Sequence, residues 1–128
     1  MYTPSSFPVD KALPALEASL AANRCVVLQA PPGSGKTTRV APFLMRAPWM
    51  SGRKILLLEP RRLAARAAAA FMARQCGEAV GESIGYHIRL DRKCGPRTRV
   101  EILTEGLLTQ RLLNDPALDD VGLVIFDE

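Results

Sequence analysis

The sequence predicts an α/β fold in which helices cover both faces of a mostly parallel sheet. Short continuous apolar runs at residues 24–29, 54–59 and 121–126 are typical of strands buried on both faces. Segments with helical spacing of their apolar residues separate these runs, and such alternation favours parallel strands. Polar or Gly-rich clusters directly follow four of the predicted strands, at the positions where folds of this class gather ligands. The length of 128 residues corresponds to about one domain.

The first 23 residues are expected to form an arm and a helix. Residues 1–9 are predicted to be irregular, because prolines at positions 4 and 8 punctuate them. A helix is predicted to follow with Asp10 as its N-cap, and its apolar positions are Leu13, Leu16 and Leu20. Residues 24–29 then form the first predicted strand, in which Cys25 is interpreted as a small core residue.

The middle of the chain is predicted to alternate helix, strand and helix. A helix begins near Lys36, and Pro42 is expected to kink or interrupt it because proline removes a backbone donor. Residues 54–59 read as a continuous apolar strand, and residues 61–75 read as a helix rich in Ala and Leu. The apolar stripe of that helix consists of Leu63, Ala67 and Phe71.

The last third of the chain is predicted to contain three strands and one helix. Residues 84–90 alternate strictly, as in a half-exposed strand, and residues 99–103 form the next strand. Thr104 is expected to cap a helix that runs to about residue 113. Residues 121–126 are the last apolar strand. One face of the alternating strand carries Ile84, Tyr86, Ile88 and Leu90.

Residues 30–37 read Ala-Pro-Pro-Gly-Ser-Gly-Lys-Thr, which is typical of a phosphate-binding P-loop between a strand and a helix. The glycines free the backbone to turn N–H groups toward an anion, and the following helix adds donors and the positive end of its dipole. Lys36 is expected to reach the outer phosphates, and the Thr37 hydroxyl is expected to coordinate Mg²⁺. The motif departs from its full pattern at Ala30, where the pattern has Gly. The predicted nucleotide-binding residues are Gly33, Ser34, Gly35, Lys36, Thr37 and Thr38.

Asp127 and Glu128 end the last apolar strand, and acidic residues there are natural partners of a P-loop. Asp127 is expected to hold Mg²⁺ through water, because this ion sheds its hydration reluctantly. Glu128 is expected to orient and deprotonate the water that attacks the γ-phosphate. The sequence therefore predicts ATP and Mg²⁺ as cofactors, Thr37 and Asp127 as metal-site residues, and Glu128 and Lys36 as catalytic residues.

Composition is that of an ordinary globular protein, with 48% hydrophobic and 23% charged residues. No apolar run approaches the roughly 18 residues of a membrane span, and the N-terminus lacks the features of a signal peptide. The three cysteines are scattered and odd in number, which favours a reduced, cytoplasmic location. The net charge of +4 is compatible with a nucleic-acid partner.

Five motifs occur in a fixed order along nearly the whole chain. They are Gly-Ser-Gly-Lys-Thr-Thr at 33–38, Pro-Arg-Arg at 60–62, Gly-Tyr-x-x-Arg at 85–89, Thr-Glu-Gly at 104–106 and Asp-Glu at 127–128. In order and spacing they resemble the DEAH-box group of superfamily-2 helicases. The resemblance implies a RecA-like motor domain of the P-loop NTPase class. It also implies an ATP-dependent helicase that moves on single-stranded nucleic acid, with RNA favoured over DNA.

In that family the Pro-Arg-Arg and Thr-Glu-Gly motifs help to track the nucleic-acid backbone. Guanidinium forks suit phosphates, and a helix N-terminus adds N–H donors. Two arginines at a helix start, where cations are slightly unfavourable, also favour an anionic partner. The resemblance therefore implies these nucleic-acid-binding residues: Arg61, Arg62, Thr104, Glu105 and Gly106.

One departure concerns the adenine base. Family members often carry Arg, expected to stack on adenine, at the position of Phe71. Three alternatives stay open: Phe71 stacks instead, Arg74 substitutes, or the contact with the base is weak. A second departure is Pro42, which lies one residue later than the family's usual proline.

The resemblance also implies an N-terminal fragment of a longer enzyme, in which residues 24–128 form the first half of the ATP-binding domain. The fragment alone is expected to be inactive, because the second motor domain with its arginines is missing. Two other functions stay open, namely a different P-loop phosphotransferase such as a small kinase, and a non-catalytic fragment that binds nucleic acid. The Pro-Arg-Arg and Thr-Glu-Gly spacings argue against the kinase.

Overall fold

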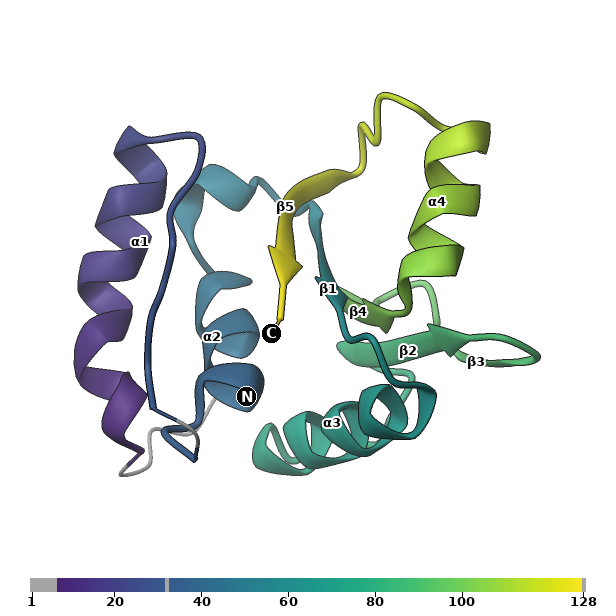
Figure 1. The fold of residues 1–128 in the computed structure, drawn as a ribbon, viewed down its shortest axis with the longest axis horizontal. Helices are drawn as coiled ribbons and strands as arrows, with labels where there is room; N and C mark the ends of the chain where they lie inside the picture. Colours follow the sequence, from purple (N-terminus) through teal and green to yellow (C-terminus); the bar gives the residue numbers. More distant parts are fainter. Residues whose placement is uncertain (1–6, 32, 128) are drawn as a thin grey trace.

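A computed structural model describes residues 7–31 and 33–127 of the chain. At its centre is a five-stranded sheet with the order β3-β2-β4-β1-β5 (Figure 1). β1 pairs in parallel with β4 and β5, β2 pairs in parallel with β4, and β2 and β3 form an antiparallel hairpin. The predicted mostly parallel sheet is therefore confirmed, with β3 as an unpredicted addition. The strands are β1 (Lys54–Leu58), β2 (Ile84–Ile88), β3 (Asp91–Lys93), β4 (Val100–Leu103) and β5 (Val121–Phe126).

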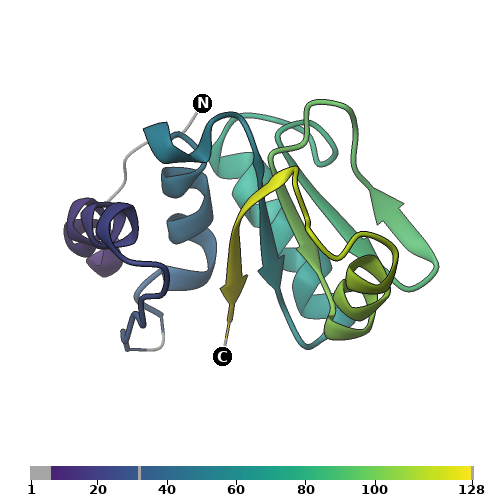
Figure 2. The same ribbon diagram turned by 90° about the horizontal axis from the view of Figure 1, so that it is seen from above.

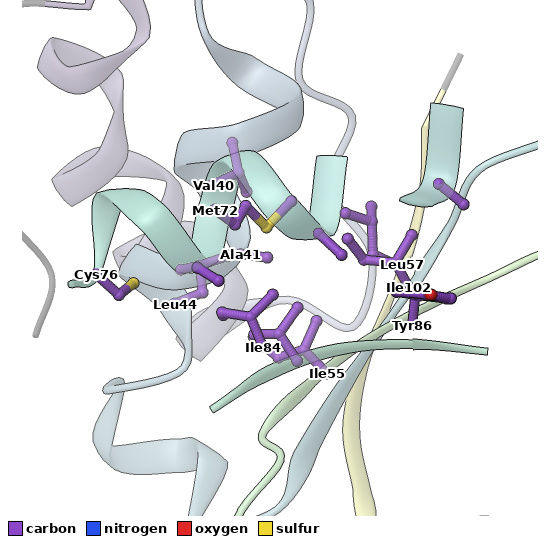
Figure 3. Packing of buried hydrophobic residues seen from close by; sticks show 14 of the residues in the cluster. Val40, Ala41, Leu44, Ile55, Leu57, Met72, Cys76, Ile84, Tyr86 and Ile102 are labelled. Atoms are coloured by element: carbon purple, nitrogen blue, oxygen red, sulfur yellow. The ribbon is translucent and has the colours of Figure 1, made fainter. Parts of the chain in front are cut away.

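Helices cover both faces of this sheet, as predicted, with α3 on one face and α4 on the other (Figure 2). Side chains alternate across a strand, so Ile55 and Leu57 of β1 face the α3 side, whereas Leu56 and Leu58 face α4. The larger core lies on the α3 side, where α2 and α3 pack against the sheet (Figure 3). The helices are η1 (Pro8–Ala12), α1 (Leu13–Ala22), α2 (Lys36–Leu44), η2 (Pro48–Met50), α3 (Arg62–Gln75) and α4 (Glu105–Asn114).

The predicted strand at residues 24–29 is wrong, because this segment has no regular secondary structure. After α1 the chain returns alongside that helix (Figure 1). A strand needs a neighbour for its backbone N–H and C=O groups, and β5 pairs only with β1 among the described residues. Val27 is 90% exposed and Cys25 is also exposed, so the predicted burial of Cys25 is wrong as well.

The helical N-terminus starts earlier than predicted. The 3₁₀ helix η1 begins at Pro8, and Asp10 is its third residue rather than the N-cap. The Asp10 carboxylate instead accepts a hydrogen bond from the Phe7 N–H at 3.1 Å. Residues 1–6 of the predicted arm lie outside the described residues. α2 continues through Pro42 and ends at Leu44, so Pro42 does not interrupt the helix, and the predicted kink stays a prediction.

Four predicted apolar positions face solvent, namely Leu90 of the alternating strand and the whole predicted stripe of α3, which is Leu63, Ala67 and Phe71. Leu90 leaves the alternating strand in a turn with φ of +64° and is 95% exposed. The Leu63 side of α3 also faces outward, with Leu63 itself 79% exposed. The inner face of α3 is built from small residues and one methionine, which let the helix approach the sheet closely. That face consists of Ala65, Ala69, Met72 and Ala73.

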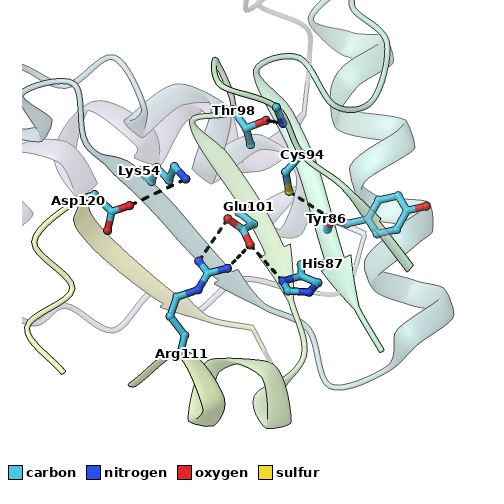
Figure 4. Close-up of polar contacts among 9 residues, drawn as sticks. Lys54, Tyr86, His87, Cys94, Thr98, Glu101, Arg111 and Asp120 are labelled. Carbon is cyan, nitrogen blue, oxygen red and sulfur yellow. Dashed lines mark hydrogen bonds and ion pairs between the residues drawn. The ribbon is translucent and has the colours of Figure 1, made fainter. Parts of the chain in front are cut away.

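One buried ion pair ties α4 to the sheet (Figure 4). Glu101 of β4 is 1% exposed and accepts hydrogen bonds from both terminal nitrogens of Arg111, the first at 3.2 Å. The hydrogen bond to Glu101 raises the pKa of Arg111, while burial opposes this rise. His87 Nδ1 lies 3.7 Å from the same carboxylate, but burial lowers the pKa of His87, so Arg111 supplies the neutralising charge at pH 7. Apolar packing contributes little to holding α4 against the sheet, because, among the described residues, Leu108 is the one of this helix that is buried.

We predict that Arg111→Ala loosens α4. It leaves Glu101 buried without its cation, and removing one partner of a buried pair costs about 3–5 kcal/mol. Amide hydrogen exchange of residues 105–114 in the full-length protein should then accelerate by about two to three and a half orders of magnitude, since each 1.4 kcal/mol is tenfold. Arg97→Ala is the control, because the Arg97–Glu82 pair is exposed and should have no measurable effect. Unchanged exchange in Arg111→Ala would show that apolar packing alone holds α4.

We also predict that the 128-residue chain, taken alone, self-associates through β5. In the described residues one edge of β5 has no strand partner, and Phe126 at its end is 73% exposed. Unpaired edges invite pairing between chains, and a lysine on the edge suppresses it. Light scattering should therefore show less association for Phe126→Lys than for Leu113→Lys, which changes an exposed leucine of α4. A monodisperse wild-type monomer would contradict the prediction.

Candidate nucleotide and nucleic-acid site

Three polar segments of the sequence meet at one edge of the sheet. β1, β4 and β5 run parallel, so their carboxyl ends lie together. Backbone bonds extend this alignment past the strands, because the Asp127 N–H donates to Leu58 O at 3.2 Å and the Glu59 N–H donates to Leu103 O at 3.0 Å. The residues after each strand therefore gather at this edge, as predicted. Glu128, the predicted catalytic base, lies outside the described residues.

The P-loop turn forms without a preceding strand. Gly33 and Gly35 have φ values of +78° and +92°, which residues other than glycine rarely adopt. The Ser34 N–H donates to Pro31 O at 3.2 Å and closes the turn. Gly35 is the N-cap of α2, and its carbonyl accepts the Arg39 N–H at 2.9 Å. The first N–H groups of α2 are thus left for a ligand at the helix start.

Two side chains of this turn reach across the site. Lys36 Nζ donates to the Ala30 carbonyl at 3.1 Å, so its ammonium group folds back over the loop. Thr37 Oγ1 donates to Asp127 Oδ2 at 3.0 Å, which joins the start of α2 to the end of β5. The Ser34 hydroxyl is buried and has no hydrogen-bond partner among the described residues. Thr38 is half-buried in the first turn of α2.

The Thr37–Asp127 pair fits a magnesium ion. Both ligand atoms are hard oxygens, and Mg²⁺ is usually bound by one or two protein oxygens, substrate phosphates and retained waters. Across residues 7–31 and 33–127, no cluster of three or more His, Cys, Asp or Glu side chains could hold a metal. The donor set therefore suits an ion that arrives with a nucleotide rather than one held by the protein alone.

Arg61 and Arg62 stand at an open groove of about 710 Å³ between the start of α3 and the β2–β3 hairpin. Arg61 is exposed, and its Nε lies 3.9 Å from Glu59 Oε1. Arg62 donates to the Arg89 carbonyl at 3.1 Å, which ties α3 to the hairpin. The groove is lined by Arg61, Arg62, Leu63, Ala64, Arg66, Ile88 and Asp91.

Sequence reasoning missed Arg66 and Asp91 as groove residues. Asp91 accepts a hydrogen bond from the Tyr86 hydroxyl at 2.9 Å and lies 3.7 Å from Arg66. Burial and the bond to Asp91 raise the pKa of Tyr86, so its hydroxyl remains a donor. The sequence carried no signal for this contact, because the turn at residues 89–90, which places Asp91 opposite Ile88, contains none of the usual turn residues.

The Thr-Glu-Gly motif forms the start of α4 at the same edge. Thr104 is the N-cap, as predicted, but its hydroxyl makes no capping hydrogen bond. Glu105 and Gly106 are exposed, and a side chain at Gly106 would meet nothing within 4 Å. The helix start is thus open to a ligand.

Phe71 and Arg74, the two candidates for adenine contact, form a pair on α3. The Arg74 guanidinium lies 5.8 Å from the centroid of the Phe71 ring, which is 40% exposed. The pair presents an aromatic and a cationic surface together.

In the described part of the chain, every helix is too short or too polar to cross a membrane.

Comparison with known proteins agrees with this geometry. The sequence model of the family described as DEAD/DEAH box helicase matches residues 10–128. The chain is 47% identical over 124 residues to the ATP-dependent RNA helicase HrpB of Escherichia coli, covering 97% of this chain and 15% of that protein. It is 35% identical over 103 residues to the ATP-dependent RNA helicase HrpA of Borreliella burgdorferi, covering 80% of this chain and 12% of HrpA.

The fold is shared as well. The crystal structure of the E. coli DEAH/RHA helicase HrpB superposes with a TM-score of 0.92 at 46% identity, over 96% of this chain and 16% of that one. The chain thus spans about 15% of the length of HrpB. A RecA-like sheet, a Gly-rich turn joined to Asp127 and a family match over residues 10–128 lead to one conclusion: the chain belongs to the DEAD/DEAH box helicase family.

Proposed function

We propose that this chain carries the ATP site and part of the single-stranded RNA surface of an ATP-dependent RNA helicase. The observation that carries the proposal is the Thr37–Asp127 hydrogen bond, which brings the phosphate-binding turn to the acidic end of β5. The names of the relatives, which are RNA helicases, support RNA over DNA. The activity of the whole helicase is part of the proposal, because the chain spans only a fraction of those proteins.

In the proposed mechanism, residues 33–38 form the turn that binds the phosphates of ATP, and the backbone N–H groups of Gly35, Lys36 and Thr37 are its donors. Thr37 and Asp127 would hold Mg²⁺, which would neutralise charge on the β- and γ-phosphates. Lys36 would leave the Ala30 carbonyl and move to the outer phosphates, a short displacement of a flexible side chain. Glu128, which follows Asp127 in the sequence, is proposed as the base that orients the attacking water.

The proposed contacts with nucleic acid are contacts with its sugar-phosphate backbone. Arg61 and Arg62 offer guanidinium donors at the groove, and Thr104, Glu105 and Gly106 offer the start of α4. Phosphate contacts carry no sequence information, so binding should be insensitive to sequence. A polyanion running along this edge would meet both groups.

The proposal also covers the domain organisation of the chain, its location in the cell and its activity when taken alone. We propose residues 1–23 as an arm and helix, residues 24–128 as part of the ATP-binding domain, and a cytoplasmic location. The 128 residues alone are proposed to be inactive, because arginines supplied by a second motor domain would be absent. A non-catalytic role in binding nucleic acid is the alternative, and ATP turnover separates the two.

We predict that Lys36→Ala abolishes ATP hydrolysis by the full-length protein, because it removes the charge facing the outer phosphates. Turnover is measured as phosphate release with and without single-stranded RNA. Lys93→Ala, which removes an exposed lysine of β3, is the control and should keep RNA-free turnover. Near-normal turnover in Lys36→Ala would refute the ATP site, and residues 1–128 alone should show no turnover.

We predict that changing Arg61 and Arg62 together to Ala weakens binding to single-stranded RNA of any sequence. Each lost phosphate contact on a single strand lowers the slope of log affinity against log salt by about 0.7, so two contacts change it by about 1.4. The charge-matched control changes the exposed Arg24 and Arg46 to Ala. Equal slopes for the two double variants, or a loss confined to one RNA sequence, would count against backbone contacts.

A further inference from the structure

The segment Phe7–Asp10 packs directly against the phosphate-binding turn. The Val9 N–H donates a hydrogen bond to the Ser34 carbonyl at 3.0 Å, and Val9 itself is 4% exposed. The Phe7 ring lies so close to Gly35 that a Cβ placed there would stand 2.2 Å from a ring carbon. This segment therefore contacts the turn through both its backbone and its side chain.

The Val9 bond fixes the direction of one peptide group in the turn. In a trans peptide the C=O and the following N–H point to opposite sides. Because the Ser34 carbonyl points outward to Val9, the Gly35 N–H points to the opposite side of the turn. The positive φ of Gly35 allows this orientation, and the Phe7 ring fills the space behind it.

A buried arginine locks the segment in place. Arg39 of α2 is 1% exposed and donates to both Asp10 carboxylate oxygens, through Nε at 3.1 Å and through a terminal nitrogen at 3.3 Å. Its guanidinium also lies 5.0 Å from the centroid of the Phe7 ring and donates to Gln75 of α3 at 3.4 Å. Asp10 in turn accepts the Phe7 N–H. One cation thus joins the segment, the helix that follows the turn, and α3.

The Asp10–Arg39 pair is better explained by the orientation that it fixes than by a contribution to folding stability. Taking a charge pair out of water costs free energy that its attraction often fails to exceed, and an apolar pair of similar volume is frequently as stable. A forked guanidinium bound to both carboxylate oxygens does, however, fix direction as well as distance. Here the fork fixes the direction of the segment Phe7–Asp10, whose Val9 N–H donates to the Ser34 carbonyl.

We propose that Phe7–Asp10, locked by the Asp10–Arg39 pair, is a positioning element that keeps the Gly35 N–H aimed at the phosphates of a bound nucleotide. This inference rests on the proposed ATP site and extends it to residues outside the motifs. Asp10, Arg39 and Phe7 touch no phosphate in this scheme. They act through the orientation of the Ser34–Gly35 peptide.

The test compares ADP affinity with RNA affinity in the full-length protein. In Asp10→Asn the carboxylate charge is lost and Arg39 stays buried without it, so the segment should release the Ser34 carbonyl. Losing one N–H bond to a charged phosphate costs about 1.5–3 kcal/mol, so ADP affinity should fall at least tenfold. Affinity for single-stranded RNA without nucleotide should stay unchanged. The control is Asp119→Asn, an exposed aspartate far along the chain, which should change neither affinity.

Two further variants separate positioning from general stability. Phe7→Ala leaves the ion pair intact and removes only the ring behind Gly35, so it should weaken ADP binding less than Asp10→Asn does. Arg39→Lys keeps the charge but loses the fork, and should fall between wild type and Asp10→Asn. Hydrogen exchange on a peptide spanning residues 33–38 gives a local readout. ADP should protect it fully in wild type and incompletely in Asp10→Asn.

The outcomes distinguish this inference from the proposed function. If Asp10→Asn bound ADP as wild type does, or lost ADP and RNA affinity in equal measure, the positioning role would be wrong while the ATP site stood. If the wild-type protein bound no ADP, or if Lys36→Ala bound ADP and turned over ATP normally, the ATP site itself would be wrong and the inference with it.

Discussion

The hydrogen bond between Thr37 and Asp127 joins two parts of the chain that no strand pairing connects in the described residues. α2 is held against α3 and the sheet by apolar packing, through Val40 and Leu44 among others. Among the described residues, its N-terminus meets the carboxyl end of β5 through this polar contact. The position of the Gly-rich turn relative to the acidic strand end therefore depends on side-chain contacts, because no backbone ladder between the described residues fixes it.

Two arginines hold helices whose starts face this edge: Arg39 is buried, whereas Arg111, in the last turn of α4, is partly buried. Arg39 connects η1, α2 and α3, and Arg111 connects α4 to β4 through Glu101. Buried ion pairs are weak evidence for stability, but a forked hydrogen bond restricts the angle at which two elements meet. At both places the restricted element begins with N–H groups that the proposed ligands would use. A forked arginine contact thus lies near both the proposed nucleotide side and the proposed nucleic-acid side of the site.

The sequence predicted the elements that their own hydropathy pattern indicates. It failed where contact with another element decides whether a strand or helix forms. A continuous apolar run predicted β1, which is buried along nearly its whole length between two covered faces. The same pattern found β5, but the predicted burial of that strand is wrong, because its residues are only partly covered and Phe126 is exposed. The similar run at residues 24–29 failed, because strand formation also requires a backbone partner, which hydropathy does not report. Leu90 failed because alternation does not reveal a positive φ. Arg39 and Glu101 were missed because charged residues are rarely buried, and their partners lie on other elements.

The two arginines of the groove illustrate why motif residues alone do not define a surface. Arg62 is held by the Arg89 carbonyl of the hairpin, and Arg61 lies beside the buried Glu59. Each guanidinium carries five N–H donors, so the bond to the Arg89 carbonyl orients Arg62 and leaves other donors for a ligand, whereas Arg61 stays largely exposed 3.9 Å from Glu59. Orientation before binding reduces the entropy lost when a side chain is ordered by its ligand. The hairpin and the carboxyl end of β1 thus lie beside the two arginines that we propose as contacts of a nucleic-acid backbone, and sequence motifs leave these neighbouring residues aside.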